Sequence, residues 1–188
     1  MSSSDLPLLR RIVTSHDSKG ISNIESDDQV ISETTPIAPG ISIAPIWKIT
    51  DGLPTGDNHL SDDGAKRQIE GLVPANGANV QITELAPGTI TPNVLSQSLI
   101  CIFTNHIIRW QHRTSSLDCN FLLAGELVLV MEDGSETALT QIGDSVVIKG
   151  GMHLWRNPSS TKWCRWMTVL MSADPVVING QALGPMIK

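Results

Sequence analysis

The chain has 188 residues, a length that suits one well-buried domain and hardly two. Hydrophobic residues make up 40% and charged residues 17%, with a mean hydropathy of +0.03, which excludes a disordered chain and a membrane-spanning one. A total of 13 Lys and Arg against 19 Asp and Glu gives a net charge of -6, so the basic field that nucleic acids require is missing. We therefore expect no nucleic-acid partner.

The three cysteines and the first residues bear on the compartment. None of the cysteines lies in a C-x-x-C arrangement, so reduced thiols are expected rather than a disulfide scaffold or a zinc finger. The start, MSSSDLPLLRR, lacks the basic beginning and the long apolar run of a secretory signal. The longest uncharged stretch, residues 85–108, is interrupted by Pro, Gly and polar residues and should not span a bilayer. We expect a cytoplasmic protein without a membrane partner.

The first 60 residues are polar and loosely patterned. Strands are expected over 10–14 and 41–49, with Ser, Asp, Thr and Pro between them. We expect an N-terminal arm over residues 1–60 and a β domain over residues 61–188. A short helix is predicted over 60–71, because acidic residues lead there and basic ones follow, as a helix dipole favours.

From Asn79 onward, short alternating runs are separated by Gly-containing turns. The predicted strands are VQITELAPG, NFLLAG, ELVLVMEDG, SETALTQIGD, SVVIKGG, MHLWRN and WCRWMTVLM. Asp133-Gly134 is a strong two-residue hairpin signal between two of these runs. Regular short strands with tight turns predict an all-β sandwich or barrel.

Two sets of polar side chains have the spacing of one strand face. Side chains two residues apart on a strand point the same way, which groups His112, Thr114, Ser116 and Asp118. The same rule groups His153, Trp155 and Asn157. Only a closed or folded-over sheet brings the two sets together. Because the chain has no Tyr and only two Phe, its apolar recognition must rely on Trp, Met and aliphatic side chains, which suits a lipophilic small molecule.

The first set resembles the first motif of the cupin superfamily. His112 stands at the motif's first histidine, and Gly125 closes the motif at the expected spacing. Thr114 stands where the second histidine is expected and Asp118 where the glutamate is expected. Two of the metal ligands that the resemblance implies are therefore substituted.

The second set resembles the second cupin motif. Gly143, His153 and Asn157 match it, with Lys149 in place of the proline and one residue fewer before the histidine. The stretches HRTSSLDCNFLLAGE, HLWRN and RRIVTSHDSKG are similar to those of small single-domain cupins found in fungal natural-product pathways. The resemblance implies a cupin-type double-stranded β-helix, a jelly-roll barrel with an extended N-terminal arm, that forms a homodimer.

The spacing before His112 departs from this pattern. Removing residues 93–110 would restore the five residues that the family places between its first glycine, here Gly88, and His112. We predict an insertion at 93–110 between two core strands. Its many apolar side chains leave three readings open: a pocket cover, an interface element, or the translation of an unspliced intron.

Our first functional hypothesis is a lyase, isomerase or cyclase acting by general acid-base catalysis on a lipophilic secondary-metabolite intermediate. His112 and His153 would serve as acid and base, Asp118 would orient one imidazole, and no cofactor would be needed. The substrate would contact four further side chains: Trp155, Asn157, Thr114 and Trp47.

Two other functions stay open on the sequence. A metal-dependent oxygenase would hold Fe, Mn or Zn with His112, His153 and Asp118 as a two-histidine, one-carboxylate set. Because Thr114 cannot replace an imidazole as a strong ligand, we expect metal affinity to be weak or absent. The third possibility is a non-catalytic barrel that binds a small ligand without converting it.

Overall fold

The computed structural model describes residues 4–35, 39–91 and 111–187. Within these ranges the chain is built almost entirely of antiparallel strands, with two short 3-10 turns. The predicted all-β class and the jelly-roll architecture are confirmed. The insertion expected at 93–110 lies outside the described residues. Across the described ranges, none of the helical turns has the length and apolar character needed to cross a membrane.

The larger sheet has six strands in the order β10-β7-β12-β5-β4-β3. Their bounds are β3 Glu33–Thr34, β4 Ile41–Ile49, β5 Ala78–Leu85, β7 Ser116–Ala124, β10 Ser145–Lys149 and β12 Cys164–Ser172. The central strand β12 pairs with β5 on one side and with β7 on the other, each along eight residues of register. Strands far apart in the sequence are thus neighbours, as jelly-roll connections require.

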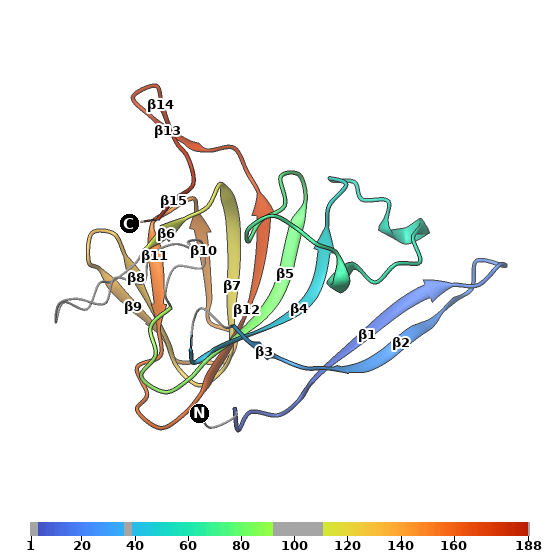
Figure 1. Ribbon diagram of the computed structural model, residues 1–188, viewed down its shortest axis with the longest axis horizontal. Helices are drawn as coiled ribbons and strands as arrows, with labels where there is room; N and C mark the ends of the chain where they lie inside the picture. Colours follow the sequence, from blue (N-terminus) through green and yellow to red (C-terminus); the bar gives the residue numbers. More distant parts are fainter. Residues whose placement is uncertain (1–3, 36–38, 92–110, 188) are drawn as a thin grey trace.

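The smaller sheet has five strands in the order β15-β6-β11-β8-β9. Their bounds are β6 His112–Arg113, β8 Leu127–Met131, β9 Glu136–Leu139, β11 His153–Arg156 and β15 Met186–Ile187. The β8–β9 hairpin turns at Asp133-Gly134, as predicted, and Gly134 has the positive φ of +85° that favours glycine. In Figure 1 this sheet faces the six-stranded one.

The hydrophobic core lies between the two sheets. The six-stranded sheet contributes Leu85, Leu122 and Trp166 to it, while the five-stranded sheet contributes Leu129 and Trp155. Full burial of side chains of this size stabilises the fold by about 1.5–3 kcal/mol each. The core therefore holds the two sheets face to face and fixes the positions of the side chains between them.

The inward face of β7 changes character along its length. Alternate residues are buried, and they run from Ser116 through Asp118 and Asn120 to Leu122. The last of these packs in the apolar core, whereas the first three are polar. One end of the space between the sheets is consequently packed with hydrocarbon, and the other is lined with hydrogen-bonding groups.

The N-terminal arm is shorter than expected. Strands β1 (Leu9–His16) and β2 (Ser22–Val30) form a hairpin that projects from the body in Figure 1, and the strand predicted over 10–14 lies within β1. Strand β4 matches the strand predicted over 41–49, but it pairs along β5, and Ile41 and Ala44 are buried. The arm expected over residues 1–60 thus ends before Ile41, because the apolar face of β4 is needed to complete the core.

The helix predicted over 60–71 does not form. The structure has 3-10 turns at η1 (Asp57–His59) and η2 (Gly64–Lys66) instead. Arg67 pairs with Asp57 and Asp62, so the charges that suggested a helix dipole are used in ion pairs that bend the chain. Gly64 lies so close to the Trp47 ring that an added Cβ would fall 2.4 Å from it. Tertiary contacts thus overrode the local charge pattern.

A last hairpin, β13 (Val176–Ile178) with β14 (Gln181–Leu183), precedes β15.

Candidate active site

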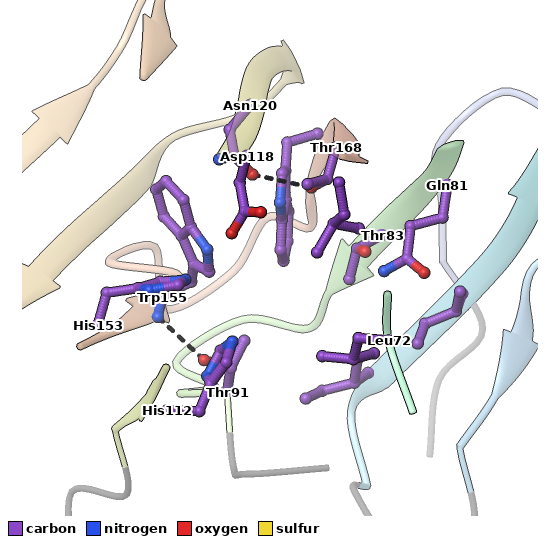
Figure 2. Close-up of a pocket in the computed structure, with 14 residues that line it drawn as sticks. Leu72, Gln81, Thr83, Thr91, His112, Asp118, Asn120, His153, Trp155 and Thr168 are labelled. Atoms are coloured by element: carbon purple, nitrogen blue, oxygen red, sulfur yellow. Dashed lines mark hydrogen bonds between the residues drawn. The ribbon is translucent and has the colours of Figure 1, made fainter. Parts of the chain in front are cut away.

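A pocket lies between the two sheets at the polar end of β7. Its cavity has a volume of about 70 Å³ and opens to solvent. Six of the fourteen lining residues are apolar and eight are polar, and the polar side chains converge on the same space (Figure 2). The lining residues are Ile41, Ile43, Leu72, Gln81, Thr83, Thr91, His112, Asp118, Asn120, His153, Trp155, Trp166, Thr168 and Leu170.

The two predicted histidines meet in this pocket. His112 on β6 and His153 on β11 are register partners in the five-stranded sheet. Their ring centroids are 4.5 Å apart, and the ring planes are tilted by 50°. The convergence that the strand-face spacing required is therefore present, with both rings on one wall of the cavity.

The tautomer of His153 follows from its hydrogen bond. Its Nδ1 lies 2.9 Å from the carbonyl oxygen of Gly151. Because a carbonyl oxygen can only accept, Nδ1 carries the hydrogen, and the neutral ring keeps its lone pair on Nε2. His153 is 3% exposed, and this burial lowers its pKa.

His112 is neutral for related reasons. Burial in the pocket is the larger cause and the charge of a protonated His153 the second, and together they lower the pKa of His112 to about 3. The two rings thus present lone pairs rather than positive charges at neutral pH. Since each disfavours a proton on the other, the pair holds at most one proton readily.

Asp118 enters the pocket from the opposite sheet. Figure 2 shows its carboxyl group pointing into the space that the two histidines border. The side chain is 4% exposed, and burial raises its pKa, while the hydrogen bond from Ser116 opposes this increase. The Ser116 hydroxyl donates to Asp118 Oδ1 at 2.5 Å, and Thr114 Oγ1 lies 2.6 Å from Ser116 Oγ.

These contacts change the role expected for Asp118. Its hydrogen-bond partner among the described residues is the Ser116 hydroxyl and not an imidazole. We therefore correct the expectation that Asp118 orients a histidine ring. A buried carboxyl group with a raised pKa is suited to hold a proton and deliver it.

Trp155 forms part of the wall, as its spacing from His153 predicted. Its ring meets the His153 ring edge-on at a centroid distance of 6.0 Å, and Trp166 lies 5.9 Å away on the other side. The Trp155 amide donates to Thr91 Oγ1 at 2.9 Å, which fixes this stretch of β11 beside the pocket. The aromatic rings offer a flat apolar surface to a ligand.

Three residues predicted to contact substrate lie elsewhere. Asn157 is 1% exposed, and its amide donates to the carbonyl oxygens of three residues that flank the core: Leu85, Ala86 and Lys162. The Trp47 indole donates to Asp57 and packs against the 57–67 segment. Thr114 does not line the pocket and reaches it only through Ser116 and Asp118. Strand-face spacing predicts which face of the sheet a side chain occupies, but not which groups form hydrogen bonds with it there.

Some pocket residues were missed on the sequence. Asn120 follows Asp118 by two positions on β7 and shares its face, so the same spacing rule could have found it. Thr168 and Trp166 come from β12, and Gln81 and Thr83 from β5. These four carry no local signal, since they reach the pocket only because β12 lies between β5 and β7.

The donor set does not fit a metal ion. Within residues 4–35, 39–91 and 111–187, no three His, Cys, Asp or Glu side chains are placed to hold one. Asp118 comes from the sheet opposite the two histidines, and Thr114 at the substituted motif position bonds to Ser116. The two-histidine, one-carboxylate centre is thus not assembled by these residues, and we derive no step through a metal.

The fold and the pocket define a jelly-roll protein with neutral histidines and a buried carboxyl group facing one cavity. No family model matches the sequence. The chain is similar to Oryzines biosynthesis cluster protein J of Aspergillus oryzae, at 44% identity over 73 residues, which are 39% of this chain and 40% of that protein. It is also similar to the cupin-domain-containing oxidoreductase srdB of Neurospora crassa, at 32% identity over 72 residues, 38% of this chain and 36% of that protein.

These relatives confirm the expected resemblance to cupins of fungal biosynthetic clusters. The chain matches about two fifths of the length of these curated relatives. Among solved structures, the chain is similar to the polyketide cyclase RemF from Streptomyces resistomycificus. That similarity has a TM-score of 0.46 and 16% identity, covering 82% of each chain.

Proposed function

We propose that the protein catalyses a cofactor-independent proton transfer on a lipophilic small molecule, as a lyase, isomerase or cyclase of secondary metabolism. The observation that carries this proposal is the pairing of two neutral imidazoles, 4.5 Å apart, in the pocket that a buried carboxyl group also faces. Groups with pKa values shifted apart in one cavity are the usual arrangement for acid-base catalysis.

The shifts assign the roles differently from the sequence hypothesis. A general base must be unprotonated, and the lowered pKa values of His112 and His153 favour that form at neutral pH. A general acid must hold a proton, which the raised pKa of Asp118 favours. The histidine pair is therefore the base, with His153 Nε2 as its free lone pair, and Asp118 is the acid.

The wall of the pocket supports a lipophilic substrate. Trp155 and Trp166 give flat apolar surfaces, and Ile41, Ile43, Leu72 and Leu170 add aliphatic ones. The similarity to a protein named for the biosynthesis of oryzines supports a natural-product intermediate as the substrate class. Each well-placed acid or base contributes about 10²- to 10⁴-fold to such a rate.

Deuterium exchange tests the proposal without knowledge of the natural substrate. The protein would be incubated in D₂O with a panel of aromatic ketones, nitriles and sulfones that carry activated C–H bonds, and exchange would be followed by proton NMR. We expect His153→Gln to slow exchange by about 10² or more, and His112→Gln to slow it as well. The matched control is His59→Gln, because His59 is exposed outside the pocket. Equal rates in all four proteins would remove the proposal.

The similarity to proteins named as oxidoreductases favours a second candidate, an oxidation. Elemental analysis of protein purified without chelator separates the two. Stoichiometric iron, manganese or zinc, with activity abolished by EDTA, would favour the oxidoreductase. Binding of the panel compounds with neither exchange nor oxidation would favour a non-catalytic binding barrel.

A further inference from the structure

In the side-chain amide of Asn120, the described residues supply a hydrogen-bond partner for the oxygen but none for the nitrogen. The side chain projects from β7 into the pocket and is 2% exposed. The Thr168 hydroxyl donates to Asn120 Oδ1 at 2.8 Å, which fixes the orientation of the amide. Asn120 Nδ2 is buried and has no hydrogen-bond partner among the residues that the structure describes. In Figure 2 this nitrogen is turned away from Thr168.

An unsatisfied buried donor is costly, so its presence in a pocket calls for an explanation. The great majority of buried polar groups are paired, because an unpaired group loses its bonds to water without replacement. An apolar residue of the same size would avoid that loss. Asn120 lines the pocket that holds the histidine pair, so a ligand there can supply the missing acceptor.

Asp118 stands two residues before Asn120 on the same face of β7. Both side chains line the pocket, and the histidine pair lies on the five-stranded sheet across from them. On the β7 wall Asn120 Nδ2 is a hydrogen-bond donor, whereas the histidine wall presents acceptors. A molecule between them would have an acceptor oxygen toward Asn120 and a removable proton toward the imidazoles.

We propose that the substrate is a carbonyl compound, and that Asn120 Nδ2 donates a hydrogen bond to its carbonyl oxygen as this oxygen becomes negative. This inference rests on the proposed proton transfer and names the substrate class for it. Removal of a proton next to a carbonyl leaves an enolate, whose charge lies mainly on oxygen. A fixed N–H donor in a dry cavity stabilises such a charge strongly.

The bonds and protons of the step balance without a further reagent. The imidazole of His153 takes a proton from the carbon beside the carbonyl, and the C–H electron pair forms the enolate that Asn120 Nδ2 holds. The enolate re-forms the carbonyl as a β-hydroxyl group leaves, and Asp118 gives that group the proton that makes it water. The proton on the imidazole then returns to the Asp118 carboxylate, and the net reaction is loss of water.

Binding of a stable enolate mimic tests the role of Asn120 apart from turnover. The probes are 2-naphthol, whose oxygen resembles that of an enolate, and 2-methylnaphthalene, which has the same shape without an acceptor. Affinities would be measured by quenching of tryptophan fluorescence, because Trp155 and Trp166 line the pocket. We expect the unaltered protein to favour 2-naphthol about tenfold or more, as one such hydrogen bond implies.

Variants assign this preference to the amide. Asn120→Leu removes the donor but leaves the Thr168 hydroxyl without its partner, so the double variant Asn120→Leu with Thr168→Val replaces both partners by apolar groups and should fold. We expect both to bind the two probes equally. Asn58→Leu replaces an exposed amide outside the pocket and is the matched control, and it should retain the preference. No preference in the unaltered protein, or a preference that persists in the double variant, would overturn the inference.

A measurement on the unaltered protein covers the case in which the variants fail to fold. The side-chain amide signal of Asn120 should shift in nitrogen-proton NMR spectra on addition of 2-naphthol and not on addition of 2-methylnaphthalene. A signal unmoved by 2-naphthol overturns the inference. If deuterium exchange slows in the two histidine variants, as the proposed function requires, but the unaltered protein shows no preference for 2-naphthol, only the carbonyl site is removed. A naphthol preference without exchange would remove the proton transfer and leave a binding site.

Discussion

His112 and His153 are backbone register partners on β6 and β11, and their rings stand 4.5 Å apart inside the pocket. The burial that keeps both rings unprotonated at neutral pH also makes the fold sensitive to acid, because a buried imidazolium is poorly solvated. The buried histidine pair therefore affects both the chemistry of the site and the stability of the fold.

Stability should fall as the pH drops below about 6.5, the ordinary pKa of histidine. In this range the unfolded chain takes up protons that folded His112, with its pKa of about 3, does not. The free energy of unfolding therefore decreases with falling pH, by up to about 1.4 kcal/mol per pH unit for one such group. Urea unfolding between pH 4.5 and 7 measures this slope.

The variant His112→Gln should flatten that slope, since glutamine does not titrate. Exposed His59 gives the matched control, and His59→Gln should leave the slope as it is. An identical pH dependence in all three proteins would mean that the imidazole of His112 is not held neutral by the fold.

The pH profile of water loss from β-hydroxy ketones should have an alkaline limb due to Asp118. The raised pKa of this carboxyl group means that it keeps its proton at a higher pH than an exposed carboxyl, and the acid is lost as pH rises through that pKa. The variant Asp118→Asn should remove the limb and lower the rate by about 10². A limb of unchanged position in the variant would assign the acid to another group.

The Ser116 hydroxyl should set the position of that limb. It donates to Asp118 Oδ1 at 2.5 Å, which stabilises the carboxylate and lowers its pKa. In Ser116→Ala the pKa of Asp118 should rise further, and the limb should move to higher pH. Thr114→Val, which removes only the next hydroxyl along, should move the limb less. A shift to lower pH in Ser116→Ala contradicts this account.

Replacement of Asn157 should affect stability rather than binding. Its amide donates to the carbonyl oxygens of Leu85, Ala86 and Lys162, and Asn157→Ala would remove all of these bonds, with Ala86 keeping only the bond from the Thr89 amide. We expect a loss of about 3 kcal/mol in the free energy of unfolding. The affinity for 2-naphthol should change less than about twofold in the protein that remains folded. A large loss of affinity with unchanged stability would restore the substrate-binding role expected from the sequence.

Local sequence patterns predicted most of the strands and the faces of their side chains. The Asp133-Gly134 hairpin and the strand over 41–49 follow from turn chemistry and alternation, which act between near neighbours. The grouping of His153 with Trp155 follows from the same period of two. Such signals depend on residues close together in the sequence and do not require a particular tertiary environment.

The hydrogen-bond and ion-pair partners of these side chains depend on how the two sheets are arranged in the folded protein. The charges of the 60–71 segment form ion pairs with one another and with the arm instead of a helix, and Asn157 binds backbone carbonyls instead of a ligand. The partners of Asp118 and Asn120 depend on which strands lie beside β7 and on which sheet faces it. Hydrogen bonds and burial are set by neighbours in space, and a period along the chain carries no information about those neighbours.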